Sequence, residues 1–151
     1  MKFVTLDIQG FTIADEFVAK ELGIYTGTKT AHFIFKPPQE YSALSTRDKK
    51  SVSYLERHHH GLRYSDGYVN YEEINSILTK YLTDVNIVYV KGCQKYNFIV
   101  GRFNEIGGTF PLVLNVELSD CNPPVPNLER KIPICMSHTG RGHKSVVYRI
   151  V

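Results

Sequence analysis

One segment, residues 70–90, constrains the fold of this chain more than any other. Asn70 can cap a helix, with Glu73 reaching back to its backbone N–H in an Asn-x-x-Glu capping pair. Apolar residues then recur at helical spacing on one face: Ile74, Ile77, Leu78, Tyr81 and Leu82. Residues 86–90 (NIVYV) follow, and they are short and almost wholly apolar, as a central parallel strand should be. A helix packed against such a strand predicts an α/β domain.

Three strands are expected before this segment. Residues 3–8 are β-branched and apolar, which predicts a buried strand. Residues 13–23 fit a strand or a short helix; we favour a strand, because residues 23–28 are typical of a hairpin turn. A clear strand follows at residues 30–36, and Pro37 ends it because proline cannot donate into a ladder.

The remaining elements complete the predicted fold. They are helices over residues 45–58 and 95–103, a strand over 112–118 and a β-prone end over 146–151. Between them, four prolines make a Cys- and His-bearing segment at about 119–144 irregular. The sequence therefore predicts a single α/β domain over residues 1–151. Its mixed sheet is expected to have three antiparallel N-terminal strands, then parallel strands, with helices flanking it.

Composition excludes some classes of protein. With 42% hydrophobic and 22% charged residues, wholesale disorder is excluded, and a net charge of +3 is too small to indicate nucleic acid by itself. No apolar run approaches the roughly 20 residues needed to span a bilayer, and the N-terminus does not resemble a signal peptide. Three cysteines, an odd number, favour a reducing compartment. We therefore expect an intracellular protein, in the cytoplasm or nucleus, without membrane contact.

The C-terminal part is locally basic. No acid follows Glu129, whereas five basic residues do: Arg130, Lys131, Arg141, Lys144 and Arg149. Two interpretations stay open, a solvated basic surface and a phosphate-binding one. On the second interpretation, the candidate nucleic-acid ligands are Arg130, Lys131, Arg141 and Lys144.

Residues 60–98 resemble the DEDDh family of 3′–5′ exonucleases. In that family a His-Gly-Ile loop leads into a helix, then a strand, then a helix that carries an acid. Here His60-Gly61-Leu62 corresponds to the loop and residues 87–90 to the strand. The resemblance implies a ribonuclease-H-like fold.

The catalytic residues of that family are largely missing. The resemblance implies four carboxylates around two metal ions, with a histidine as general base. The first motif is Asp7-Ile8-Gln9, so an amide replaces its second acid, and residues 91–97 contain no acid where Tyr96 or Asn97 takes its place. In the third motif His143 is followed by Tyr148 instead of Asp. Asp7, Gln9 and His143 are thus degenerate remnants, and catalytic Mg²⁺ or Mn²⁺ is not expected.

The resemblance therefore implies a catalytically inactive binding module for nucleic acid, or for a protein partner in nucleic-acid metabolism. One alternative is a divergent, active metal-dependent exonuclease that uses Asp7 with Glu117 or Asp120. Another is a purely protein-interaction domain. More loosely, the segments LDIQGF, FKPP, HHGL and YVKG resemble uncharacterised arthropod sequences associated with mobile elements or viruses, which suggests a lineage only.

A second set of residues has metal-ligand spacing. Cys121, Cys135, His138 and His143 form the pattern C-x13-C-x2-H-x4-H, and two thiolates with two imidazoles suit tetrahedral zinc. Such a zinc would be structural, because all four ligands come from the protein. The alternative is two buried cysteines and two surface histidines.

Two further features have an ordinary interpretation and a functional one. His58, His59 and His60 are expected at the C-terminus of a helix, where they interact favourably with its dipole, or else they contact a metal or phosphate. Cys93 is expected to be buried, with a reactive thiol as the alternative.

Overall fold

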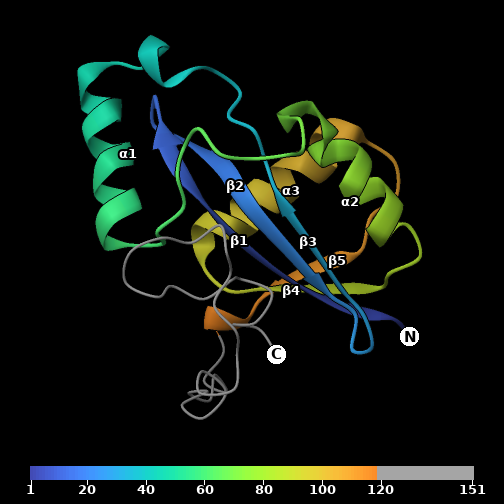
Figure 1. The fold of residues 1–151 in the computed structure, drawn as a ribbon. Coiled ribbons are helices and arrows are strands. Elements are labelled where there is room, and N and C mark those ends of the chain that lie inside the picture. The colour runs from blue at the N-terminus through green and yellow to red at the C-terminus, as the bar shows by residue number, and fades with distance from the viewer. Residues whose placement is uncertain (119–151) are drawn as a thin grey trace.

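The structure, a computed structural model, describes residues 1–118 and shows a five-stranded mixed sheet flanked by helices (Figure 1). The α/β class predicted from the sequence is thereby confirmed. The strands are β1 (Phe3–Ile13), β2 (Glu16–Tyr25), β3 (Thr30–Ile34), β4 (Ile87–Val90) and β5 (Leu112–Asn115). The α-helices of the described residues are α1 (Thr46–His58), α2 (Ile74–Leu82) and α3 (Cys93–Ile106).

The strand order in the sheet is β3-β2-β1-β4-β5. Strands β1, β2 and β3 pair antiparallel, whereas β4 pairs parallel with β1 and β5 parallel with β4. This order differs from the predicted one of three antiparallel strands followed by parallel strands. After β3 the chain crosses over through α1 and α2, and the parallel strands extend the sheet from β1. Strand β1 is therefore central, with neighbours on both sides.

Helix α1 lies on one side of β1 and β2, and helices α2 and α3 lie on the other (Figure 1). Val4, Leu6 and Ile8 of β1 lie in one buried cluster with apolar residues of α2 and α3. Phe11 and Ile13 belong to the other row of alternating side chains, and they pack with residues of α1 and the loops beside it: Leu44, Val52 and Tyr64. Strand β1 thus contributes to two cores.

Strand β1 runs five residues beyond its predicted end, and its pairing with β2 is irregular between Gln9 and Gly10. Gln9 faces Glu21 and Gly10 faces Ala19, so Lys20 is the extra residue of a β-bulge. A Cβ at Gly10 would lie 2.2 Å from the carbonyl oxygen of Val18, so only glycine fits there. The hairpin turn that follows holds Ala14 and Asp15 at positive φ.

Other helix and strand ends also differ from the predictions: β2 is shifted by two to three residues from the predicted range 13–23, and β3 ends two residues before its predicted end. The predicted Asn70–Glu73 capping pair is wrong: residues Tyr71–Glu73 form a 3-10 turn, η2, and the Asn70 side chain makes no capping bond. Helix α3 is longer than the predicted range 95–103. The strand predicted over 112–118 ends at Asn115, because the Asn115 side chain accepts from the backbone N–H groups of Gly92 and Glu117 and holds a 3-10 turn, η3 (Val116–Leu118).

Other predicted features agree with the structure or lie outside it. Helix α1 begins after Ser45, whose hydroxyl accepts from the Asp48 backbone N–H at 3.1 Å. No helix within residues 1–118 is both long and apolar enough to cross a membrane. The β-prone segment 146–151 lies outside the described residues.

Candidate functional site

Asp7 lies where the central strand continues past the end of its parallel neighbour. Strand β4 pairs only with residues 3–5 of β1, so Asp7 is just beyond the carboxyl end of β4. Sheets of this class bind ligands outside the carboxyl ends of their strands. On the other side Asp7 faces Gly23 of β2, which has no side chain to fill the space. The candidate site is therefore built around Asp7, which is buried.

A lysine occupies this site. The Nζ of Lys95 lies 2.6 Å from Oδ1 of Asp7, and the two side chains are 22% and 8% exposed. The backbone N–H of Ile8 donates to the same oxygen at 3.0 Å. Lys95 belongs to the first turn of α3, within the stretch 91–97 where the exonuclease family carries its second-motif acid. A cation is thus present where the resemblance implies an acid.

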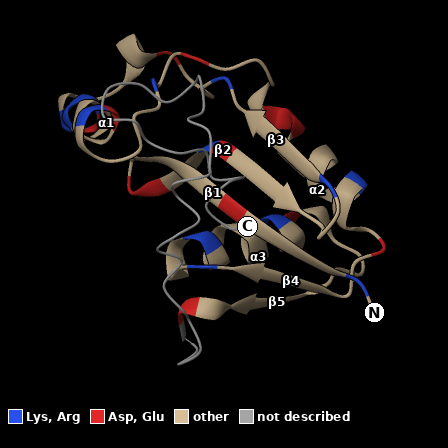
Figure 2. Cartoon of the chain, turned by 60° about the horizontal axis from the view of Figure 1, so that its bottom comes forward, with Lys and Arg blue, Asp and Glu red and all other residues tan. Residues whose placement is uncertain are grey.

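A second buried carboxylate lies on the same face of the sheet. Glu21 faces Gln9 across the β1–β2 pair, and its side chain is fully buried. The Nε2 of His32 on β3 lies 2.5 Å from Oε2 of Glu21. Figure 2 shows acidic positions in the middle of β1 and β2, with basic positions near the start of α3. Asp7 and Glu21 therefore each have a basic partner.

The acids of the described residues do not gather as metal ligands. Within residues 1–118 no group of three or more His, Cys, Asp or Glu side chains is placed to hold a metal ion. Glu117 is exposed on η3, and Asp120 lies outside the described residues. Of the degenerate catalytic remnants, Asp7 and Gln9 lie on one face of β1, whereas His143 is outside the described residues.

The C-terminal predictions remain predictions. The four predicted zinc ligands, Cys121, Cys135, His138 and His143, all lie outside the described residues. The same is true of the proposed nucleic-acid ligands Arg130, Lys131, Arg141 and Lys144.

The three consecutive histidines have different environments. His58 ends α1 and His59 is its C-cap, as predicted, whereas His60 is buried. The Nδ1 of His60 accepts from the backbone N–H of Leu62 at 3.0 Å, so its Nε2 carries the proton and donates to the Gly10 carbonyl at 3.1 Å. The ring also contacts Phe11 edge-on, with centroids 4.8 Å apart. His60 thus fixes the His-Gly-Leu loop to β1.

Cys93 is exposed, and the prediction of burial is wrong. Helix α3 begins at Cys93, two residues before its predicted start, which brings this thiol into the first turn. Its sulfur lies 3.7 Å from Nδ2 of Asn115, beside a hollow that Tyr89, Tyr96 and Leu114 help to line.

Lys20 is a buried cation that was not among the residues predicted from the sequence. As the bulge residue of β2 it points inward, and its Nζ donates to the carbonyl oxygens of Phe35 (2.8 Å) and Tyr64 (2.6 Å) and to that of Asp66. Burial lowers the pKa of Lys20 to about 8, although the carboxylates of Asp66 and Glu56 act to raise it. A charged pair, Lys20-Glu21, inside the otherwise apolar run of β2 was the available signal.

No protein-family model matches this chain, and no curated protein matches it.

Proposed function

We propose that the chain is a catalytically inactive, exonuclease-like domain with a ribonuclease-H-like fold, and that it serves as a binding module for nucleic acid. A mixed sheet with an acid on its central first strand supports the fold. The main support for a lack of catalytic activity is the ion pair between Lys95 and Asp7.

The ion pair opposes metal binding in two ways. A divalent cation at Asp7 would have to displace the Lys95 ammonium, which would then lie beside it as a like charge. A hydrated metal ion also needs several oxygen ligands. Around Asp7, however, Gln9 offers only a neutral amide, and Glu21 is already paired with His32.

The nuclease test uses labelled single strands with Mg²⁺ or Mn²⁺. We expect no degradation by the wild-type chain, and no difference between the wild type and Asp7→Ala, because one paired carboxylate cannot assemble a two-metal centre. Degradation that persists in Asp7→Ala would identify a contaminant. Metal-dependent degradation that disappears in Asp7→Ala would overturn the proposal and favour an active, divergent exonuclease.

The binding test is a salt titration. We expect the wild-type chain to bind a fluorescein-labelled oligothymidylate of about 12 nucleotides, with log Kd rising linearly with log salt as counterions are released. Fluorescence anisotropy between low and moderate salt gives the slope. An absence of binding at low salt would contradict the nucleic-acid role and leave a protein partner as the remaining interpretation.

A further inference from the structure

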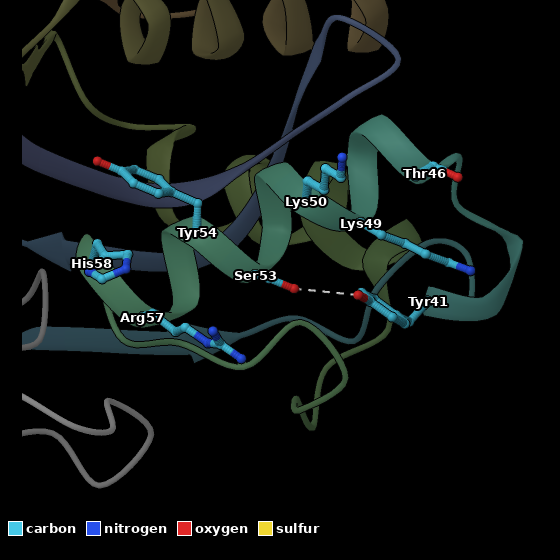
Figure 3. A pocket seen from close by; sticks show the side chains of 8 residues that line it. All are labelled: Tyr41, Thr46, Lys49, Lys50, Ser53, Tyr54, Arg57 and His58. Atoms are coloured by element: carbon cyan, nitrogen blue, oxygen red, sulfur yellow. Dashed lines mark hydrogen bonds between the residues drawn. The ribbon is translucent and has the colours of Figure 1, made fainter.

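One face of α1 combines basic and aromatic side chains. Residues 46, 49, 50, 53, 54 and 57 recur at intervals of three and four, so they share one side of the helix. The opposite side carries the buried residues Asp48 and Val52. Together with Tyr41, from the 3-10 turn η1 (Tyr41–Ala43), the exposed side lines a shallow hollow of about 380 Å³ (Figure 3).

The positive charge of this face is uncompensated within the described residues. Lys50 and Arg57 are exposed and Lys49 is half-buried, and none of the three forms an ion pair with a residue of 1–118. The two acids of α1 are used elsewhere: Asp48 accepts from the Ala14 backbone N–H and Glu56 from the Tyr64 backbone N–H. The hollow is therefore a cationic surface.

Two exposed tyrosines accompany these cations. Tyr41 is 38% and Tyr54 is 63% exposed, and in Figure 3 their rings lie at opposite edges of the face that the helix presents. The Tyr41 ring is held in place, because Lys49 Nζ lies 5.6 Å from its centroid and its hydroxyl is 3.4 Å from Ser53 Oγ. Tyr54 contacts His58, with ring centroids 5.1 Å apart. Flat apolar faces are thus presented beside positive charges.

We propose that this α1 surface (Tyr41, Lys49, Lys50, Ser53, Tyr54 and Arg57) binds single-stranded nucleic acid. Lysine and arginine would contact phosphates, and the tyrosines would stack on bases, which is the combination that recognises single strands without sequence preference. Paired bases in a duplex do not offer their faces to such stacking. The inference rests on the proposed nucleic-acid function and assigns that function to a surface of the described residues.

The dimensions of the surface suit a short strand. Arg57 lies eight positions after Lys49 in the helix, which is about 12 Å along the axis at about 1.5 Å per residue. A stacked single strand advances about 3.4 Å per nucleotide, so about three or four nucleotides span this distance. Phosphates can therefore meet the basic side chains in succession.

The charge test compares two double variants that each remove two lysines. Lys49→Gln/Lys50→Gln changes the α1 surface, and Lys29→Gln/Lys80→Gln is the matched control, on the β2–β3 turn and α2. With the oligothymidylate, we expect the α1 variant to bind about tenfold more weakly near 0.1 M salt, with its salt slope reduced by about 1.4. The control variant should change Kd by less than about twofold.

The stacking test uses Tyr54. We expect Tyr54→Ala to weaken binding by about tenfold without changing the salt slope, because it removes a stacking face and no charge. Tyr54→Phe should restore binding. An exposed side chain that contributed only to stability would not give this pattern.

The outcomes separate the surface from the function. If the wild type binds and both α1 variants bind equally well, the α1 surface is not the binding site, and the proposed nucleic-acid function still stands. If the Lys29→Gln/Lys80→Gln control weakens binding as much as Lys49→Gln/Lys50→Gln does, binding depends on net charge alone, and the assignment to the α1 surface again fails. If the wild type does not bind, the proposed function itself fails.

Discussion

Replacing Lys20 by methionine is expected to lower the free energy of unfolding by about 3 kcal/mol or more. Its Nζ donates to three backbone carbonyls, of which those of Phe35 and Tyr64 are buried and that of Asp66 is partly buried, and each buried acceptor left without a donor costs about 1–3 kcal/mol. Methionine fills the same space and recovers only the apolar part of the packing. Urea unfolding followed by tyrosine fluorescence measures the loss. The control Lys29→Met changes an exposed lysine and should shift stability by no more than about 0.5 kcal/mol.

The pH dependence of this loss provides an independent readout. The pKa of Lys20 falls from 10.5 in the unfolded chain to about 8 in the folded one, so unfolding takes up a proton between these values. The contribution of Lys20 to stability therefore rises with pH in this window, by at most about 1.4 kcal/mol per pH unit, and is constant at lower pH. The stability difference between the wild type and Lys20→Met should widen from pH 8 to 10. A difference that stays constant would show that the buried amine keeps its ordinary pKa.

Local patterns in the sequence predicted the helices and strands but not the side-chain contacts between them. Helix α2 and strand β4 follow from helical spacing and from a short apolar run, and both kinds of pattern involve neighbouring residues. The Asn70 cap failed because η2 precedes α2 and moves the start of the helix to Ile74. A capping pair depends on backbone geometry at a single turn, which residue spacing does not determine.

The site residues were missed for a different reason. The exonuclease resemblance implies an acid within residues 91–97 and gives no indication of a lysine there, and the partner of Lys95, Asp7, is 88 positions away. Lys20 likewise bonds to carbonyls of Phe35 and Tyr64, which are 15 and 44 positions distant. The bulge that turns Lys20 inward interrupts the simple alternation of a strand. Contacts between distant segments depend on strand register, which a single sequence does not reveal.

The ion pair at the candidate site can be tested by a double-mutant cycle. Lys95→Met is expected to destabilise the chain by about 2 kcal/mol, because it leaves the carboxylate of Asp7 buried without its cation. Asp7→Asn should cost less, since the Lys95 side chain is 22% exposed and its ammonium can turn toward water. The double variant should recover most of the loss, as a neutral pair needs no compensating charge. Lys91→Met, which changes an exposed lysine just before α3, is the matched control.

The coupling energy of this cycle distinguishes a charge-compensating lysine from one that only packs. We expect about 1–2 kcal/mol of coupling between Lys95 and Asp7 from urea unfolding of the four proteins. A coupling near zero would mean that Asp7 does not depend on Lys95, and would remove the main support for an inactive site. The same Lys95→Met protein should still leave labelled strands intact with Mn²⁺, because removing the ammonium supplies no second carboxylate beside Asp7. Degradation by Lys95→Met alone would show instead that this lysine inhibits an otherwise competent metal centre.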